Sequence, residues 1–287
     1  MDVAVVGAGR VGTALAVLLG RAGHRIVAAS GREASRARVE TWLPDVPFLP
    51  SAEAARAAEV VLLAVPDDAI AAACDEVAVT GGFTDEAFVA HLSGAAPLLA
   101  LGPARAAGAH VLSMHPVQTV PDVESGIERL PGAHVAVTAW EEPGFEVGER
   151  LASDWGGHPF RLAEESKPLY HAAAVFCSNY LVAVEGLAER LFREAGVEDP
   201  LPAFAPLAEA TLANVVRVGP AAALTGPVSR GDAGTVRRNL EAISAHAPQA
   251  AAAYVALADA AIDLAVRARR LGPDAVMGLR EVLDEWR

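Results

Sequence analysis

The sequence predicts an α/β protein with two domains: a doubly wound parallel sheet at the N-terminus and an all-helical domain at the C-terminus. Over residues 1–157, short apolar runs alternate with alanine-rich stretches, which is the pattern of βαβ units around a parallel sheet. Residues 158–287 lack such runs, and prolines separate long segments that are typical of helices. The length of 287 residues also suits two domains of ordinary size.

Six short, mostly apolar runs are the expected strands of the first domain. Each is apolar enough for a strand that is buried on both faces. They cover residues 3–6, 25–29, 60–65, 87–92, 110–113 and 134–138. In the second domain, helices are expected over residues 167–195, 232–245 and 249–270, because strand signals fade there.

Composition and charge limit the classes of partner. The formal net charge of −13 argues against a nucleic-acid-binding surface, which needs clustered basic residues. The most apolar stretch, residues 242–258, is interrupted by proline and polar residues, which indicates packed helix rather than a membrane span. No basic signal-peptide segment precedes the first strand, and Cys74 and Cys177 have no metal-ligand spacing. We expect a cytoplasmic protein with buried, reduced thiols and no bound metal.

A glycine-rich turn follows the first expected strand and precedes an amphipathic helix. Its spacing is G-x-G-x-x-G, in which the first glycine permits a tight turn, the second lets backbone approach a pyrophosphate, and the third allows close helix packing. The helix N-terminus attracts the phosphates. The turn consists of Gly7, Ala8, Gly9, Arg10, Val11 and Gly12. The pattern predicts a Rossmann domain that binds a dinucleotide; the alternative is a Rossmann domain that has lost its cofactor.

The end of the second strand indicates which dinucleotide is bound. An NAD enzyme usually carries an acid there for the ribose 2′-hydroxyl, but this chain has Ser30, Gly31 and Arg32. Arg32 can pair with a 2′-phosphate and Ser30 can donate a hydrogen bond to it, so NADP(H) is the favoured cofactor. Arg10 adds positive charge near the same group. The alternative for Arg32 is a solvated surface arginine.

The third and fourth strands end in turns that face the same crevice, because ligands of open α/β sheets bind at the carboxyl ends of the strands. The Val65-Pro66 turn can lie along the dinucleotide, and Asp67 is expected to cap the following helix. Ser93 follows the fourth strand and is a candidate for the nicotinamide or substrate side. A simple turn serine is the alternative.

Several polar side chains follow the fifth strand. His115 stands beside a rigidifying proline, and Gln118 and Thr119 come within a few residues. A lone histidine is usually structural, but its place at a strand end favours a position in the active site. We therefore expect His115 to act in catalysis and Gln118 and Thr119 to contact substrate.

A stripe of polar residues opens the long helix that begins the second domain. Helical spacing places Lys167, His171 and Ser178 on one face, with Asn179 adjacent. Hydride transfer to a ketone builds charge on oxygen, and a lysine ammonium can stabilise that charge and donate the proton. His171 can orient the lysine or share the proton donation. The alternative is a first-turn surface lysine beside a core histidine.

A second polar loop lies between later helices. Arg230 can bind a carboxylate through two hydrogen bonds, and Asp232 is expected to cap the helix that starts there.

With these residues assembled, the chain resembles the bacterial proteins that join a Rossmann-like domain to a DUF2520 domain. These proteins are relatives of the 6-phosphogluconate and β-hydroxyacid dehydrogenase superfamily. The resemblance covers essentially the whole chain. It rests on the glycine motif and on residues 91–94, 115–119, 167–179, 225–227 and 230–232.

The resemblance implies a reaction and an assembly. Some members of the family resemble ketopantoate reductases, which implies NADPH-dependent reduction of a small 2-keto acid such as 2-ketopantoate. The superfamily has a catalytic lysine followed four residues later by asparagine; Lys167 matches the lysine, and His171 occupies the asparagine position. A C-terminal domain like that of 6-phosphogluconate dehydrogenase and a homodimer through the helical domain are also implied.

Three alternatives stay open for the function, and one for the cofactor. The His115-Pro116 pair is similar to prephenate or arogenate dehydrogenases, and the small helical domain is similar to pyrroline-5-carboxylate reductases. A protein of another class, a non-catalytic NADP(H)-binding regulator, would use the same dinucleotide site. A deazaflavin is the alternative cofactor for related Rossmann proteins.

Overall fold

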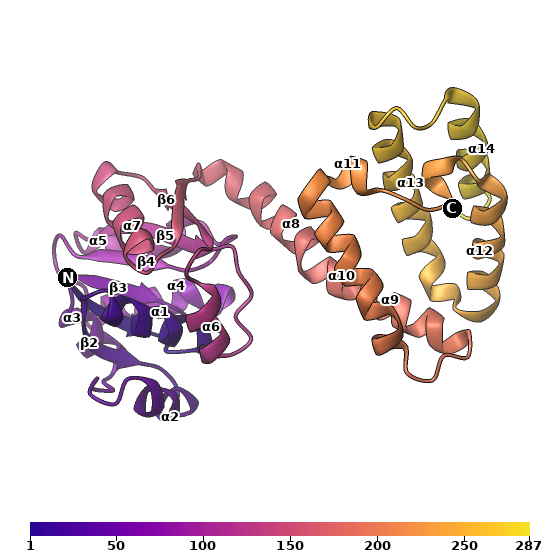
Figure 1. Ribbon diagram of the computed structural model, residues 1–287. Coiled ribbons are helices and arrows are strands. Elements are labelled where there is room, and N and C mark those ends of the chain that lie inside the picture. The colour runs from indigo at the N-terminus through magenta and orange to yellow at the C-terminus, as the bar shows by residue number, and fades with distance from the viewer. The chain divides into compact units, whose positions relative to one another are not determined.

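The structure is a computed structural model that describes residues 1–287. The chain divides into two compact units, Met1–Ser178 and Asn179–Arg287. The first unit continues past residue 157, because the last strand of its sheet and one further helix belong to it (Figure 1).

The first unit is built around one seven-stranded sheet with the strand order β2-β1-β3-β4-β5-β6-β7. Neighbouring strands are parallel throughout, except that β5 and β6 are antiparallel. The strands are β1 (Asp2–Val6), β2 (Arg25–Ser30), β3 (Val60–Leu63), β4 (Phe88–His91), β5 (His110–Pro116), β6 (His134–Ala139) and β7 (His158–Arg161).

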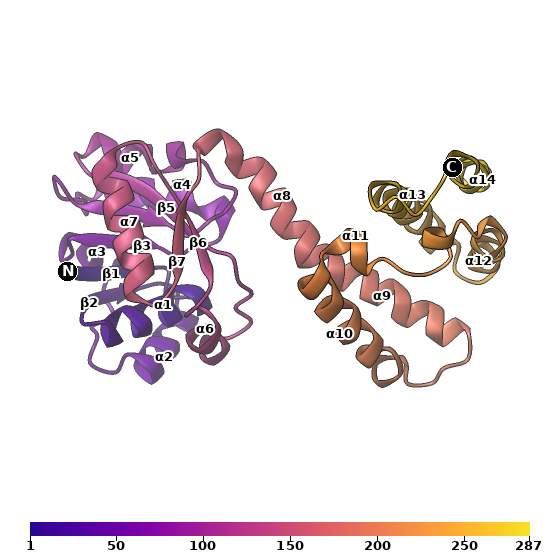
Figure 2. The same ribbon diagram turned by 45° about the horizontal axis from the view of Figure 1, so that its top comes forward.

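Helices cover both faces of this sheet, as Figure 2 shows. Alternate residues of the central strands point into two separate cores: Val3 and Val5 belong to the core that includes α1 and α7, whereas Ala4 and Val6 belong to the core that includes α3 and α4. The helices are α1 (Arg10–Arg21), α2 (Glu33–Trp42), α3 (Ser51–Arg56), α4 (Ile70–Val79), α5 (Gly102–Ala106), α6 (Val123–Arg129), α7 (Glu142–Asp154) and α8 (Lys167–Cys177). The predicted doubly wound architecture is confirmed.

All six predicted strands form, and the sheet differs from the prediction in three respects. β7 was missed because its sequence, His-Pro-Phe-Arg, has no apolar run; Pro159 is tolerated because β7 is an edge strand. β6 runs against β5, so only β1 to β5 bring their carboxyl ends to a common edge. β5 also continues to Pro116, three residues beyond its predicted end.

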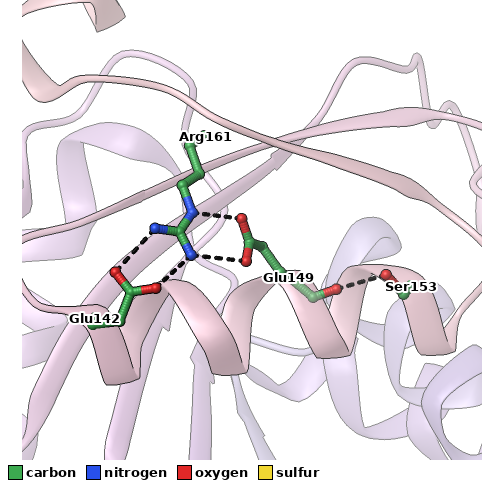
Figure 3. Close-up of polar contacts among 4 residues, drawn as sticks. All are labelled: Glu142, Glu149, Ser153 and Arg161. Atoms are coloured by element: carbon green, nitrogen blue, oxygen red, sulfur yellow. Dashed lines mark hydrogen bonds and ion pairs between the residues drawn. The ribbon is translucent and has the colours of Figure 1, made fainter.

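Arg161 attaches the edge strand β7 to helix α7 (Figure 3). Its guanidinium donates to Glu142 at 2.6 Å and to Glu149 at 2.7 Å, and it lies 4.5 Å over the Phe145 ring. The ion pairs are exposed to solvent and therefore contribute little to stability by themselves. Their effect is to align β7 with the helix that packs on β5 and β6.

The second unit is all helical, as predicted. Its core is formed by α12, α13 and α14, which contribute Val236, Leu240, Ile262, Leu279 and Leu283. The helices are α9 (Asn179–Glu194), α10 (Pro200–Val218), α11 (Pro220–Ala223), α12 (Ala233–His246), α13 (Ala251–Arg267) and α14 (Pro273–Asp284).

Two local predictions for the helical part have opposite outcomes. Asp232 caps α12 by accepting a hydrogen bond from the Thr235 amide at 2.9 Å, as expected. The single helix expected over residues 167–195 is wrong, because the backbone at Ser178 leaves the helical region (φ −120°, ψ −67°) and separates α8 from α9.

Burial was also expected for both cysteines, but only Cys74 is buried and Cys177 is exposed.

Two helical stretches, Glu164–Glu194 and Pro248–Arg267, are long and apolar enough to cross a membrane by length and composition alone. That test is weak, because core helices of soluble proteins also pass it. The second stretch contributes Val255, Ala258 and Ile262 to the core of its unit.

Replacing Gly12 by alanine is expected to destabilise the first unit. The added Cβ would lie 2.6 Å from the Ala64 Cβ and 2.9 Å from the Val5 Cγ1, and overpacking of this kind costs about 1–3 kcal/mol. Thermal unfolding followed by circular dichroism measures the effect. Gly20→Ala in the same helix is the matched control, because its nearest neighbour would lie at 3.6 Å. Equal melting temperatures for the two variants would contradict the argument.

Candidate functional site

Two cavities adjoin each other along the carboxyl edge of the sheet in the first unit. One has a volume of about 600 Å³ and the other about 410 Å³. They share the residues Gly9, Arg32, Ala64, Val65 and Pro66, so together they form one elongated cleft.

The glycine turn forms the floor that both cavities share. Gly7 has φ +88°, and a Cβ there would lie 2.5 Å from the Val65 Cγ1, so this position requires glycine. The Ser30 carbonyl accepts hydrogen bonds from the amides of Gly7 and Ala8 at 2.9 and 2.8 Å. At Gly9 the nearest atom to an added Cβ lies 3.8 Å away, so the protein leaves space above the backbone.

The larger cavity lies beside the end of β2. Gly31 and Arg32 line it, as the sequence predicts for the cofactor, and Ser35 and Ser51 line it as well. Ser30 does not line it: the side chain is buried, and its hydroxyl hydrogen-bonds the Ser51 hydroxyl at 3.0 Å. Sequence reasoning missed Ser51 because it is brought there by α3, which begins about 20 residues after β2.

Two arginines connect the glycine turn to neighbouring segments. Arg10 donates to the Pro121 carbonyl at 3.0 Å and lines the smaller cavity, not the one beside Ser51. Arg38, on α2, donates to the Ala8 carbonyl at 3.0 Å. Arg38 was not predicted, because only the tertiary structure brings α2 against the turn.

The smaller cavity contains a short hydrogen bond between two strand ends. The Ser93 hydroxyl donates to the Asp67 carboxylate at 2.6 Å and accepts from the amides of Ala95 and Ala96 at 3.1 and 2.8 Å. The prediction that Asp67 caps the next helix is wrong, because the turn that it opens has no side-chain cap. Ser93 serves both as a turn residue and as part of the cavity wall.

Lys167 is buried directly behind this wall. Its side chain is 2% exposed, which excludes the surface lysine of the alternative interpretation. The ammonium donates to the Ser113 hydroxyl at 2.6 Å and to the Ser93 carbonyl at 3.3 Å. Burial lowers the pKa of Lys167 to about 8, and the negative charges of Glu164 and Asp67 oppose that shift.

His115 lines the same cavity as Ser93, and its ring is held by Tyr170 of α8. The Tyr170 hydroxyl lies 2.7 Å from Nδ1 of His115, and the His171 ring contacts the His115 ring edge-on at 6.4 Å. Burial, with the charges of His171 and Lys167, lowers the pKa of His115 to about 4. Gly94 makes room for the ring, since a Cβ there would lie 2.9 Å from it.

A second buried imidazole, missed by the sequence analysis, lies at the end of β4. His91 is fully buried, and its Nδ1 accepts a hydrogen bond from the Ser93 amide at 3.1 Å. Its Nε2 has no hydrogen-bond partner. Burial lowers the pKa of His91 to about 3, so the ring is neutral at physiological pH. A histidine in an otherwise apolar strand was the signal that could have found it.

The remaining predicted site residues are distributed differently. Gln118 lines the smaller cavity, whereas Thr119 does not and only donates its amide to the Gln118 side chain at 2.9 Å. Ser178 ends the first unit, while Asn179 and Arg230 are exposed residues of the second unit.

The cleft therefore has two chemically distinct ends. Backbone amides, Arg32 and two serines at one end suit phosphate groups. At the other end the neutral His115 ring lines the cavity, while the neutral His91 ring and the Lys167 ammonium lie buried behind the wall. An ammonium can stabilise negative charge on an oxygen and supply a proton.

Comparisons with known proteins agree with this fold. Residues 1–116 match the Rossmann-like domain family, and residues 133–261 match the family described as domain of unknown function, DUF2520. No curated protein sequence matches the chain.

Solved structures similar to the chain share its fold at low sequence identity. A candidate NADP oxidoreductase from Bacteroides fragilis, BF3122, has a TM-score of 0.75 at 22% identity and covers 91% of this chain and 98% of its own. The protein TM1727 from Thermotoga maritima has a TM-score of 0.72 at 22% identity, with coverage of 93% and 99%. A reductive aminase from Aspergillus terreus, in complex with NADPH and ethyl levulinate, has a TM-score of 0.66 at 19% identity, with coverage of 100% and 99%. The chain therefore combines a Rossmann-like domain with a DUF2520 domain that follows it.

Proposed function

We propose that the chain is an NADP(H)-dependent oxidoreductase that transfers a hydride between the cofactor and a small carbonyl substrate. The observation that carries the proposal is the continuous cleft, which joins the glycine turn to Ser93 and His115. The similarity of fold to a reductive aminase that binds NADPH supports it.

The residues of the cleft fit such a cofactor. The open space above Gly9 allows the backbone to approach a pyrophosphate, and the α1 N-terminus favours its charge. Arg32, Ser35 and Ser51 would hold a 2′-phosphate, and Val65 would lie along the dinucleotide. When bound, NADPH would supply the hydride.

Lys167 is the proposed proton donor. When a hydride adds to a carbonyl carbon, the electron pair of the C=O π bond moves to oxygen, which then takes one proton. The Lys167 ammonium has three N–H donors, of which Ser113 and the Ser93 carbonyl take two. Lys167 itself lines neither cavity, so the proposal requires the substrate oxygen to reach the third N–H at the Ser93 turn, where His115 of the cavity wall would polarise that oxygen.

We propose a small 2-keto acid, 2-ketopantoate first, as the substrate. This follows from the family resemblance, with Gln118, which lines the smaller cavity, as the proposed carboxylate contact. Thr119 and Ser178 are the other substrate contacts proposed within the first unit. His171, in edge-on contact with His115, is proposed to orient that ring.

A second candidate reaction is the reduction of a C=N bond. Asp67 places a carboxylate in the cavity wall beside Ser93, where it would stabilise a cationic iminium group better than an anionic substrate.

We also propose that the chain forms a homodimer through its helical unit. The first two helices of that unit, α9 and α10, expose large apolar side chains, among them Val182 (71% exposed), Leu207 (68%) and Val216 (80%). Exposed apolar surface of this kind marks protein interfaces.

With 2-ketopantoate as the substrate, the purified protein is expected to oxidise NADPH faster than NADH. The near-ultraviolet absorbance of the cofactor measures the rate, and a panel of other 2-keto acids and cyclic imines is tested in the same way.

Arg32→Ala is expected to weaken NADPH binding about tenfold, the worth of one charge-assisted pairing, and to leave NADH binding unchanged. Arg36→Ala is the matched control, since Arg36 packs on Phe48 and does not line the cleft. If Arg32→Ala weakened the binding of NADPH and NADH equally, Arg32 would not recognise the 2′-phosphate. If the wild-type chain bound NADPH but turned over no substrate, the non-catalytic NADP(H)-binding regulator would be favoured.

Lys167→Ala is expected to lower turnover by about 10²-fold or more, in keeping with general-acid catalysis, while NADPH affinity stays nearly unchanged. Lys167→Met gives the same result with the side-chain volume preserved. Because the donor must carry its proton, wild-type turnover is expected to fall as the pH rises through about 8, the pKa of Lys167. Steady-state rates across pH measure this. Unaltered turnover in both variants would exclude Lys167 from the mechanism.

Sedimentation is expected to give a dimer for the wild type and a monomer for Val216→Lys, because a charge in the interface opposes association. Val79→Lys on α4, equally exposed at 79%, is the control and is expected to remain dimeric. A monomeric wild type would contradict the proposed assembly.

A further inference from the structure

Tyr170 has no role in the proposed reaction so far, although its hydroxyl contacts a residue of the cavity wall. We propose that Tyr170 is a positioning residue that keeps the proton of the neutral His115 ring on Nε2, so that His115 presents an N–H donor to the cavity. The use of this donor in catalysis rests on the proposed function, but the tautomer itself does not.

The geometry leaves the Tyr170 hydroxyl little freedom. It lies 2.7 Å from Nδ1 of His115, and the two rings meet edge to face at 5.5 Å and 89°. Phe160, on β7, packs against the Tyr170 ring at 6.1 Å. Tyr170 stands three residues after the buried Lys167 on α8, so the same helix turn fixes both side chains.

Counting donors and acceptors selects one tautomer. If Nδ1 of His115 carried the proton, it would donate to the tyrosine oxygen, and the tyrosine O–H would have no acceptor in a half-buried position. If the tyrosine donates to Nδ1, the phenol proton and the Nδ1 lone pair are both used. The proton of the neutral ring is then on Nε2, and His115 lines the cavity.

The protonation states of the two groups agree with this arrangement. Burial lowers the pKa of His115 to about 4 and raises that of Tyr170 to about 12. Near neutral pH the ring is therefore uncharged and the phenol keeps its proton. The positive charge of Lys167 further disfavours an imidazolium.

A neutral N–H donor stabilises a developing oxyanion without giving up its proton. His115 and Lys167 would then have separate tasks: the imidazole holds the oxygen through a hydrogen bond, and the ammonium provides the proton. This division explains why a histidine in the cavity wall is kept from charging.

Nitrogen-15 NMR of the full chain with labelled histidine reads the tautomer directly, without cofactor or substrate. His115→Gln identifies the His115 signals by their loss. In the wild type we expect a protonated, pyrrole-type Nε2 and a hydrogen-bonded, pyridine-type Nδ1. In Tyr170→Phe we expect the proton to be shared between the two nitrogens. A protonated Nδ1 in the wild type, or a spectrum unchanged in Tyr170→Phe, would overturn the proposal.

Steady-state kinetics, with whichever substrate the chain turns over, provide a second measurement beside the NMR spectrum. Tyr170→Phe is expected to lower kcat about tenfold, the worth of one hydrogen bond, with KM for NADPH unchanged. Tyr254→Phe is the control, because it removes a hydroxyl that contacts only Asn239 in the second unit. Equal losses in the two variants would overturn the catalytic half of the proposal. A chain that reduces no carbonyl would refute the proposed function, while the NMR result would still decide the tautomer.

Discussion

The burial of the Lys167 ammonium is the constraint on which the site depends. Removing an unpaired ammonium from water costs several kcal/mol, so the folded chain must surround it with oxygen atoms. Those oxygens are the Ser113 hydroxyl on β5 and the Ser93 carbonyl after β4. The start of α8 is thereby attached to two adjacent strands, and the residues one turn later, Tyr170 and His171, meet His115 as a consequence.

The two ends of the cleft differ in the charge of the groups that surround them. At the glycine turn, backbone amides and arginines favour negative charge, and the open space above Gly9 leaves room for a phosphate group. At the other end, His91 and His115 are held neutral by burial, and the ammonium of Lys167 lies beside them. In the proposed reaction this ammonium would deliver one proton while the two rings stay uncharged.

Much of the first unit could be predicted because its signals are local. The alternation of apolar runs with helical stretches revealed six strands, and the glycine spacing revealed the turn after β1. The antiparallel β6 and the edge strand β7 could not be predicted in this way. Strand direction depends on how a connection crosses the sheet, and β7 depends on pairing with β6 and on the contacts of Arg161 with α7.

The sequence by itself determined which residue types are present at strand ends and helix starts: the glycines, Arg32, Ser93, His115 and Lys167. The tertiary structure alone decided their partners, because hydrogen bonds such as that from Lys167 to Ser113 join residues 54 positions apart. In the structure Asp67 accepts a hydrogen bond from the Ser93 hydroxyl and does not cap a helix, and Ser51, not Ser30, lines the cavity. His91 and Tyr170 also belong to the site, although the sequence did not indicate them. The physical reason is that burial and long-range hydrogen bonding, which set the pKa of each group, exist only once the sheet and α8 are assembled.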